Sequence, residues 1–277
     1  MTTFIIAQLT IRETQRRRIL WVVVLLALGF LALYGIGLHY IYQGLLENLP
    51  DRANLSSITG GLLSIGLYVT NFLIALMAVL MSAGSVSGEI ESHTIDTLVT
   101  KPVGRWELIL GKWLGFVGLL LGYIVLLPGG VILISRWMTG VEIAHLWAGM
   151  GLILLQGLIL LSLSLAGGTR LTTMANGALA FMLYGIAFLG SWIEQIGALF
   201  ENETAVQIGI ITSLIMPSEA LWRKALVLFQ PNLGNTPMVS GPFAVASQPS
   251  DLMIGYAIVY MLVLLALALY SFSTRDL

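Results

Sequence analysis

The sequence predicts an all-α polytopic membrane protein, and three observations carry that prediction. Hydrophobic residues make up 57% of the 277 residues. Charged residues make up only 10%, whereas a soluble domain carries about 25%. Six uncharged runs are each long enough to cross the roughly 30 Å hydrocarbon core of a bilayer, which takes about 20 apolar residues. A run in that setting is expected to be helical, because a helix pairs its own backbone groups.

The predicted spans belong to one transmembrane domain, residues 1–277, and contain no Asp, Glu, Lys or Arg. Ahead of the first span, residues 1–18 mix apolar side chains with three consecutive arginines, Arg16 to Arg18. That mixture predicts an interfacial helix with its basic end against anionic headgroups. The approximate bounds of the six spans are 19–38, 62–83, 113–135, 146–168, 171–193 and 252–274.

Two long polar segments connect these spans. Residues 84–112 separate the second span from the third and carry seven charged side chains. Residues 194–251 precede the last span and hold five of the eight prolines. Within this second segment, Pro217 is expected to begin a short helix, since proline is favoured in the first turn. We expect residues 194–251 to form a structured cap rather than a flexible linker.

The distribution of Lys and Arg predicts the orientation. An even number of spans puts both termini on one side, together with residues 84–112. Nine Lys and Arg residues fall on that side and four on the other. By the positive-inside rule, both termini and residues 84–112 are expected in the cytoplasm. The nine are Arg12, Arg16, Arg17, Arg18, Lys101, Arg105, Lys112, Arg170 and Arg275.

Small residues form a stripe at the start of the third span. Gly111, Gly115, Gly118 and Gly122 fall at i, i+4, i+7 and i+11, which is one face of a helix. Small side chains at this spacing let a neighbouring helix approach closely. The stripe therefore predicts a packing face.

The segment 84–112 also carries an amphipathic pattern. If residues 89–101 are helical, Ile95, Leu98 and Val99 share one face, and Pro102 ends the helix. A short helix held between two spans would act as a lever, because a push on it moves both. The alternative is that residues 84–112 form a solvent-exposed loop without a coupling role.

The same segment resembles the cytoplasmic loop of ABC-2 type permeases, the membrane subunits of a class of ABC transporters. The similarity lies in the pattern Ser87-Gly-Glu-Ile-Glu91, Thr94, Leu98, Pro102 and Arg105, followed by Leu110-Gly-Lys112. The six spans and the interfacial helix are similar too. Residues 217–223 resemble a segment of the permeases that accompany nitrous oxide reductase maturation. The sequence departs from that segment at Glu219 and at Met216, which directly precedes it. The substrate of those permeases is therefore not assigned to this protein.

The resemblance implies a type V exporter-like permease fold, a second permease copy (homodimer or related heterodimer) and two ABC ATP-binding subunits. It implies that residues 89–101 form a coupling helix that sits in a groove of the ATP-binding subunit. A smaller second contact is implied at Thr169 and Arg170. The positions that match the coupling helix and its flank are Glu89, Glu91, Thr94, Asp96, Leu98 and Arg105.

The chain itself lacks the pattern of an ATPase. Gly111-Lys112 is not a phosphate-binding loop, because no Gly stands five residues earlier and no Ser or Thr follows. ATP and Mg are therefore expected in the partner subunit, with no cofactor in this chain. Glu89, Glu91 and His93 are a poor zinc set, so we expect no metal. No Gly-x-Ser-x-Gly elbow suggests a hydrolase, and no extended basic block suggests nucleic-acid binding.

Two other transport-related functions remain to be weighed. An ion-coupled carrier places ionisable residues at mid-membrane depth, and the six runs contain none. A membrane anchor that transmits force to an extracytoplasmic partner, without transporting cargo, stays open as an alternative. The lack of charge within the spans predicts export of a neutral, amphipathic or lipid-like substrate. Candidate pathway residues, which could equally form helix–helix hydrogen bonds, are Asn71, Tyr123, Gln156, Asn176 and Tyr184.

Overall fold

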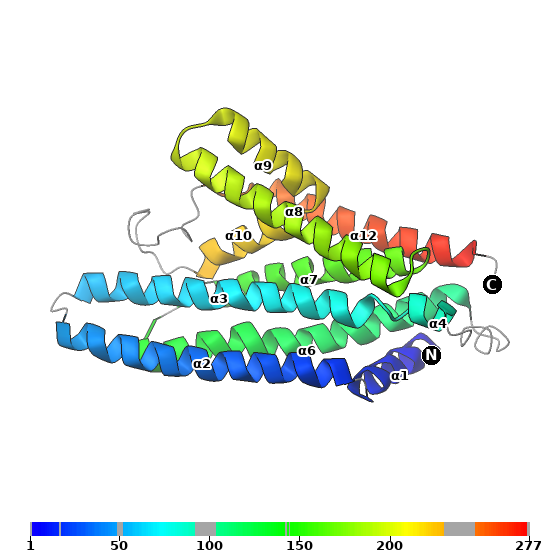
Figure 1. Ribbon diagram of the computed structural model, residues 1–277, viewed down its shortest axis with the longest axis horizontal. Helices are drawn as coiled ribbons and strands as arrows, with labels where there is room; N and C mark the ends of the chain where they lie inside the picture. The colour runs from blue at the N-terminus through cyan, green and yellow to red at the C-terminus, as the bar shows by residue number, and fades with distance from the viewer. Residues whose placement is uncertain are drawn as a thin grey trace.

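The computed structural model describes residues 2–16, 18–48, 52–91, 104–141, 143, 145–229 and 247–275. These residues form a helical bundle, and no strand occurs among them. Figure 1 shows the long helices side by side along the longest axis. They are α2 (Arg18–Asn48), α3 (Arg52–Ser82), α6 (Arg105–Thr139), α7 (Leu146–Gly168), α8 (Thr173–Leu199) and α12 (Leu252–Ser273).

The prediction of six spans is confirmed. Six helices are long and apolar enough to cross a membrane, or up to seven candidates if a bent helix pair counts as one span. α3 and α7 are the most buried of them, whereas α2 and α12 leave most of their apolar surface exposed. Leu33 on α2 and Tyr270 on α12 illustrate this exposure. A hydrophobic exterior around a packed interior fits a bilayer as the solvent.

The helices extend beyond the apolar runs that predicted them. α2 continues to Asn48 and α3 begins at Arg52, so a large part of residues 39–61, between the first two predicted spans, is helical. α6 begins at Arg105, about two turns before the predicted span. Run length reports how much of a helix lies in hydrocarbon, not where its hydrogen bonding ends. The start of α1, the end of α12 and α4 (Ser87–Glu91) lie at the same end of the bundle.

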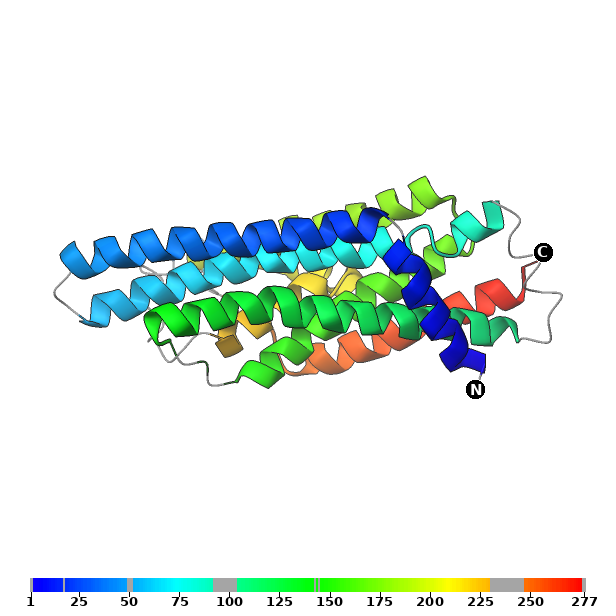
Figure 2. The same cartoon turned by 90° about the horizontal axis from the view of Figure 1, so that it is seen from below.

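The N-terminal helix α1 (Thr2–Arg16) crosses the start of α6 at a steep angle, as Figure 2 shows. Gly111, Gly115 and Gly118 of the glycine stripe make that contact, which confirms the predicted packing role for these three but not for Gly122. A Cβ at Gly111 would lie 2.6 Å from the Ile6 Cβ, and one at Gly115 would lie 2.8 Å from the Ala7 carbonyl oxygen. The opposite side of α1 exposes Phe4 and Leu9. This exposed apolar side supports the expected interfacial position.

The segment after α8 enters the bundle. α9 (Glu203–Ile215) folds back along α8, and α10 (Ser218–Phe229) turns from α9 by 106° at Met216 and Pro217. α10 packs against α7, α8, α12 and α3. Its Trp222 and Phe229 side chains are almost fully buried. The expectation of a structured segment is met in residues 194–229 and 247–251. However, residues 194–199 belong to α8, and α10 lies inside the bundle rather than on it as a cap.

Candidate functional site

Polar side chains cross-link the helix ends where α4 and both ends of the chain lie. We call this group the polar platform: Glu89, Glu91, Arg105, Lys112, Thr169 and Arg170. Five of these six were predicted as contacts for an ATP-binding subunit, and Lys112 adds a buried cation. The other predicted contacts, Thr94, Asp96 and Leu98, lie outside the described residues. Of the predicted coupling helix, residues 89–101, the structure describes only residues 89–91, which belong to α4.

Glu89 and Lys112 join α4 to α6. The Lys112 Nζ lies 2.6 Å from a Glu89 carboxylate oxygen and also donates to the Ser85 carbonyl oxygen at 2.6 Å. Lys112 is only 5% exposed although it was counted as a cytoplasmic loop residue. A buried ammonium needs such a partner, since an uncompensated charge is costly to desolvate. The pair therefore fixes α4 on the first turns of α6.

Glu91 joins α4 to the start of α8. Its carboxylate accepts hydrogen bonds from the Thr173 backbone N–H at 3.1 Å and from the Thr173 hydroxyl at 3.4 Å. The Ser87 and Thr173 hydroxyls also lie 2.8 Å apart. A carboxylate at the N-terminus of α8 is favourable because the first backbone N–H groups of a helix lack intrahelical partners. α4 therefore contacts α8 and α6 through separate side chains.

The remaining platform residues contact the end of α12. Arg105 donates to the carbonyl oxygens of Ser273 at 3.3 Å and Arg275 at 2.7 Å. The Thr169 hydroxyl and the Arg170 Nε both donate to the Ser271 hydroxyl, at 2.8 and 2.9 Å. The turn between α7 and α8 is thus tied to the last turn of α12. Movement at the platform would reach α6, α8 and α12 together.

The five candidate pathway residues separate into different settings. Asn176 donates to the carbonyl oxygens of Ala83 and Ser164, at 3.0 and 2.7 Å, which is the helix–helix bonding weighed against a lining role. Gln156 is fully buried. Asn71 and Tyr184 meet inside the bundle, where the Asn71 Nδ2 donates to the Tyr184 hydroxyl at 3.5 Å. Only Tyr123 lines the pocket described next.

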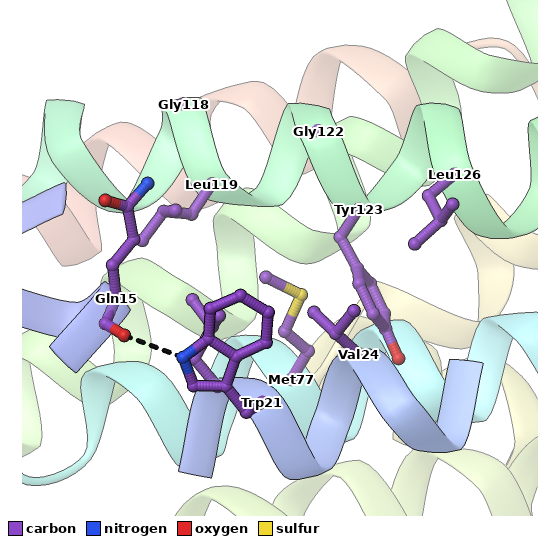
Figure 3. A pocket seen from close by; sticks show the side chains of 10 residues that line it. Gln15, Trp21, Val24, Met77, Gly118, Leu119, Gly122, Tyr123 and Leu126 are labelled. Carbon is purple, nitrogen blue, oxygen red and sulfur yellow. Dashed lines mark hydrogen bonds between the residues drawn. The ribbon is translucent and has the colours of Figure 1, made fainter. Parts of the chain in front are cut away.

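The pocket lies between α1, α2, α3 and α6 and has a volume of about 530 Å³ (Figure 3). The Tyr123 ring points from α6 toward α2, and the Trp21 Nε1 donates to the Gln15 carbonyl oxygen at 3.0 Å. Among the described residues, the lining consists of Gln15, Leu20, Trp21, Val24, Met77, Gly118, Leu119, Gly122, Tyr123 and Leu126, none of which is charged. These side chains are apolar apart from Gln15 and the polar groups of Trp21 and Tyr123, a composition that is common in ligand pockets.

The six predicted spans are uncharged, but charged side chains from residues outside those runs are buried in the bundle. Besides Lys112, the side chains of Glu194, Glu219 and Arg223 are at most 5% exposed. Glu194 falls in α8 because that helix runs past the predicted end of its span. Glu219 and Arg223 are buried because α10 turns into the bundle. The sequence feature that could have pointed to the burial of Glu219 and Arg223 is the charged motif of residues 217–223. An exposed short helix would have the same composition.

Glu194 and Arg223 form a second buried ion pair, with 2.7 Å between the Arg223 Nη2 and the carboxylate. The Ser247 hydroxyl donates to the other Glu194 oxygen at 2.7 Å. The pair joins α8, α10 and the segment before α12. Beside it, the Asn71 Nδ2 also donates to Glu219 at 3.4 Å. No cluster of three metal-ligating side chains occurs in the part of the chain that the structure describes.

The architecture defines a polytopic helical membrane subunit whose helix ends are coupled through one polar surface. Comparison with known families identifies it further: the family model described as ABC-2 family transporter protein matches residues 4–277. Since the match covers nearly the whole chain, the protein belongs to the ABC-2 transporter family. It is an integral membrane permease subunit, and members of this family pair with an ABC ATP-binding subunit. No curated protein is similar enough to the chain to count as a match.

Proposed function

We propose that the protein is the permease of an ATP-driven exporter, with the polar platform in the cytoplasm of a bacterial inner membrane. Two permease copies, identical or related, would pair with two ATP-binding subunits that hold ATP and Mg. The observation that carries the proposal is the set of contacts from α4. Glu89 reaches α6 and Glu91 reaches α8, so one short helix is tied to two spans.

Coupling follows from those contacts. Closure of the ATP-binding subunits would press on residues 89–101, which continue from α4. The Glu89–Lys112 pair would transmit the push to α6, and the bonds from Thr173 to Glu91 would transmit it to α8. α12 would follow through Arg105 and the turn at Thr169 and Arg170. The access between two permeases would change as these spans shift together.

The pocket supports a neutral, amphipathic or lipid-like substrate. The described residues of its lining are uncharged, and the pocket lies beside the α1–α2 junction, where Arg16 and Arg18 are exposed. An amphiphile would place its apolar part against Trp21, Met77 and Leu126. The buried charges do not contribute to this pocket. The similarity of residues 217–223 to the permeases of nitrous oxide reductase maturation suggests only that the protein belongs to that type of permease. It does not indicate the substrate.

The test is charge reversal at the platform. The chain is co-expressed with its ATP-binding subunit as wild type and as Glu91→Arg, purified, and assayed for ATPase activity. We expect the variant to lose most of the co-purifying subunit, or to retain it with ATPase activity changed several-fold, because the bonds from Thr173 to Glu91 are lost. Glu203→Arg, an exposed residue at the start of α9, is the matched control.

Normal co-purification and normal ATPase activity in Glu91→Arg would refute the proposed coupling through α4. The membrane-anchor alternative predicts the same ATPase result without movement of an amphiphile. It is separated by reconstituting the complex in vesicles with a fluorescent lipid analogue. ATP-dependent export of the analogue supports the exporter, and its absence beside a coupled ATPase supports the anchor.

A further inference from the structure

Glu219 lies in the interior of the bundle, at mid-span depth. It is 1% exposed and sits in the first turn of α10. Its neighbours Asn71 and Tyr184 come from near the midpoints of α3 and α8. The Asn71 Nδ2 donates to the Glu219 Oε1 at 3.4 Å, and the Tyr184 hydroxyl bonds to the same carboxyl group. We call these three residues the Glu219 cluster.

The charged and titratable groups around this cluster leave Glu219 without an ion pair. Arg223, one turn along α10, bonds to Glu194 of α8 and to Ser213 of α9. α3 contributes Tyr68, which accepts a hydrogen bond from the Trp192 indole. α7 carries no titratable side chain. From α12, the Tyr256 and Tyr260 hydroxyls donate to carbonyl oxygens at the end of α9. Within the described residues, no Lys, Arg or His pairs with Glu219.

The hydrogen bonding of the cluster is incomplete in a specific way. Asn71 uses its Nδ2 on Glu219, while the Asn71 Oδ1 and the Glu219 Oε2 are buried and have no hydrogen-bond partner among the residues that the structure describes. The Asn71 Oδ1 can only accept a hydrogen bond, and the Glu219 Oε2 can only accept one while the carboxyl group is ionised. A proton on the carboxyl group supplies the missing donor, because an amide and a carboxylic acid can pair through two hydrogen bonds. Protonation also removes a buried, unpaired charge, which is costly in a protein interior and in a bilayer.

We propose that the Glu219 cluster is a proton-binding site at mid-span depth, in which Glu219 holds a proton in the conformation seen here. The ligand is the proton itself. It would leave when α10 moves far enough for the carboxyl group to meet water, and it would return when α10 packs again. The two conformations would then differ by one proton at this site, independently of how the platform is driven.

Infrared spectroscopy of the purified protein in lipid tests this directly. A neutral carboxylic acid has a C=O stretching band that is separate from the bands of ionised carboxylates. At pH 7 we expect this band in the wild type and its loss in Glu219→Gln, an isosteric neutral replacement. Glu203→Gln, at an exposed glutamate, should leave the band in place.

Absence of the acid band in the wild type at pH 7, or its persistence in Glu219→Gln, would overturn the proposal. A band that appears only after sodium is removed would show a cation site instead, and would also overturn it. If Glu219→Gln fails to fold, Asn71→Ala decides the matter. We expect that variant to keep the band but move its frequency, because one hydrogen-bond partner is lost. An unmoved band would place the proton elsewhere.

Discussion

The polar platform and the interior around α10 handle buried charge in different ways. At the platform, the buried Lys112 has a carboxylate at 2.6 Å. In the interior, Arg223 has one at 2.7 Å, but Glu219 on the same helix has no cationic partner among the described residues. A buried ion pair fixes two helices relative to each other, because separating the pair would leave each charge buried without compensation. A single buried carboxyl group instead gains or loses a proton.

The difference has a functional meaning. The pairs at Lys112 and Arg223 join elements that should move as one: α4 with α6, and α8 with α10. The Glu219 cluster joins α10 to α3 through hydrogen bonds that depend on one proton. α10 is therefore held to α8 by an ion pair in addition to the Tyr184 bond, whereas its contact with α3 through Asn71 can be released. This contrast predicts that equivalent substitutions in the two settings have unequal effects.

The largest effect is expected where a buried pair is broken. Arg223→Met removes the cation and leaves Glu194 buried and unpaired, which costs about 3–5 kcal/mol of stability. Thermal unfolding of the detergent-solubilised protein, followed by tryptophan fluorescence, measures the loss. Lys224→Met is the matched control, because its partner Asp251 has a side chain that is 95% exposed. Similar losses in the two variants would mean that burial of the Glu194–Arg223 pair contributes nothing.

The same substitution at the two buried glutamates sharpens the comparison. Glu194→Gln leaves the Arg223 guanidinium without a counter-charge, whereas Glu219→Gln replaces a neutral group with a neutral one. We expect Glu219→Gln to change stability by less than about 1 kcal/mol and Glu194→Gln to cost at least about 2 kcal/mol more. Unfolding curves of both variants at pH 7 provide the measurement. If Glu219→Gln is the more damaging variant, Glu219 must be ionised and stabilised by a counter-charge. That result would contradict the claim that Glu219 is neutral.

The contrast also explains what could be predicted from the sequence. The spans follow from run length and charge depletion, because the bilayer imposes both. The glycine stripe follows from helical spacing alone. Glu194 and Arg223, 29 residues apart, could not be matched, since their pairing depends on the 106° turn between α9 and α10. A short helix with Glu219, Trp222 and Arg223 has the composition of a surface helix. Only its packing against α3, α7, α8, α9 and α12 reveals its burial.

The smallest effect is expected for a substitution that tests whether packing, as well as charge, stabilises the end of the bundle where the polar platform lies. α1 crosses α6 on the glycine stripe, and a Cβ at Gly115 would lie 2.8 Å from both the Ala7 carbonyl oxygen and the Thr10 Cβ. Gly115→Ala should therefore cost about 1–3 kcal/mol, the usual penalty for overpacking. At Gly122, in the same stripe, no atom lies within 4 Å of an added Cβ.

Gly122→Ala is consequently the matched control, and we expect its stability to be unchanged or higher by up to about 1 kcal/mol, since alanine favours a helix over glycine. Thermal unfolding compares the two variants under identical conditions. A loss at Gly115 with none at Gly122 would mean that α1 is clamped on α6 where Lys112 holds α4. Equal behaviour would mean that α1 yields freely, and that the charged contacts alone define the platform end of α6.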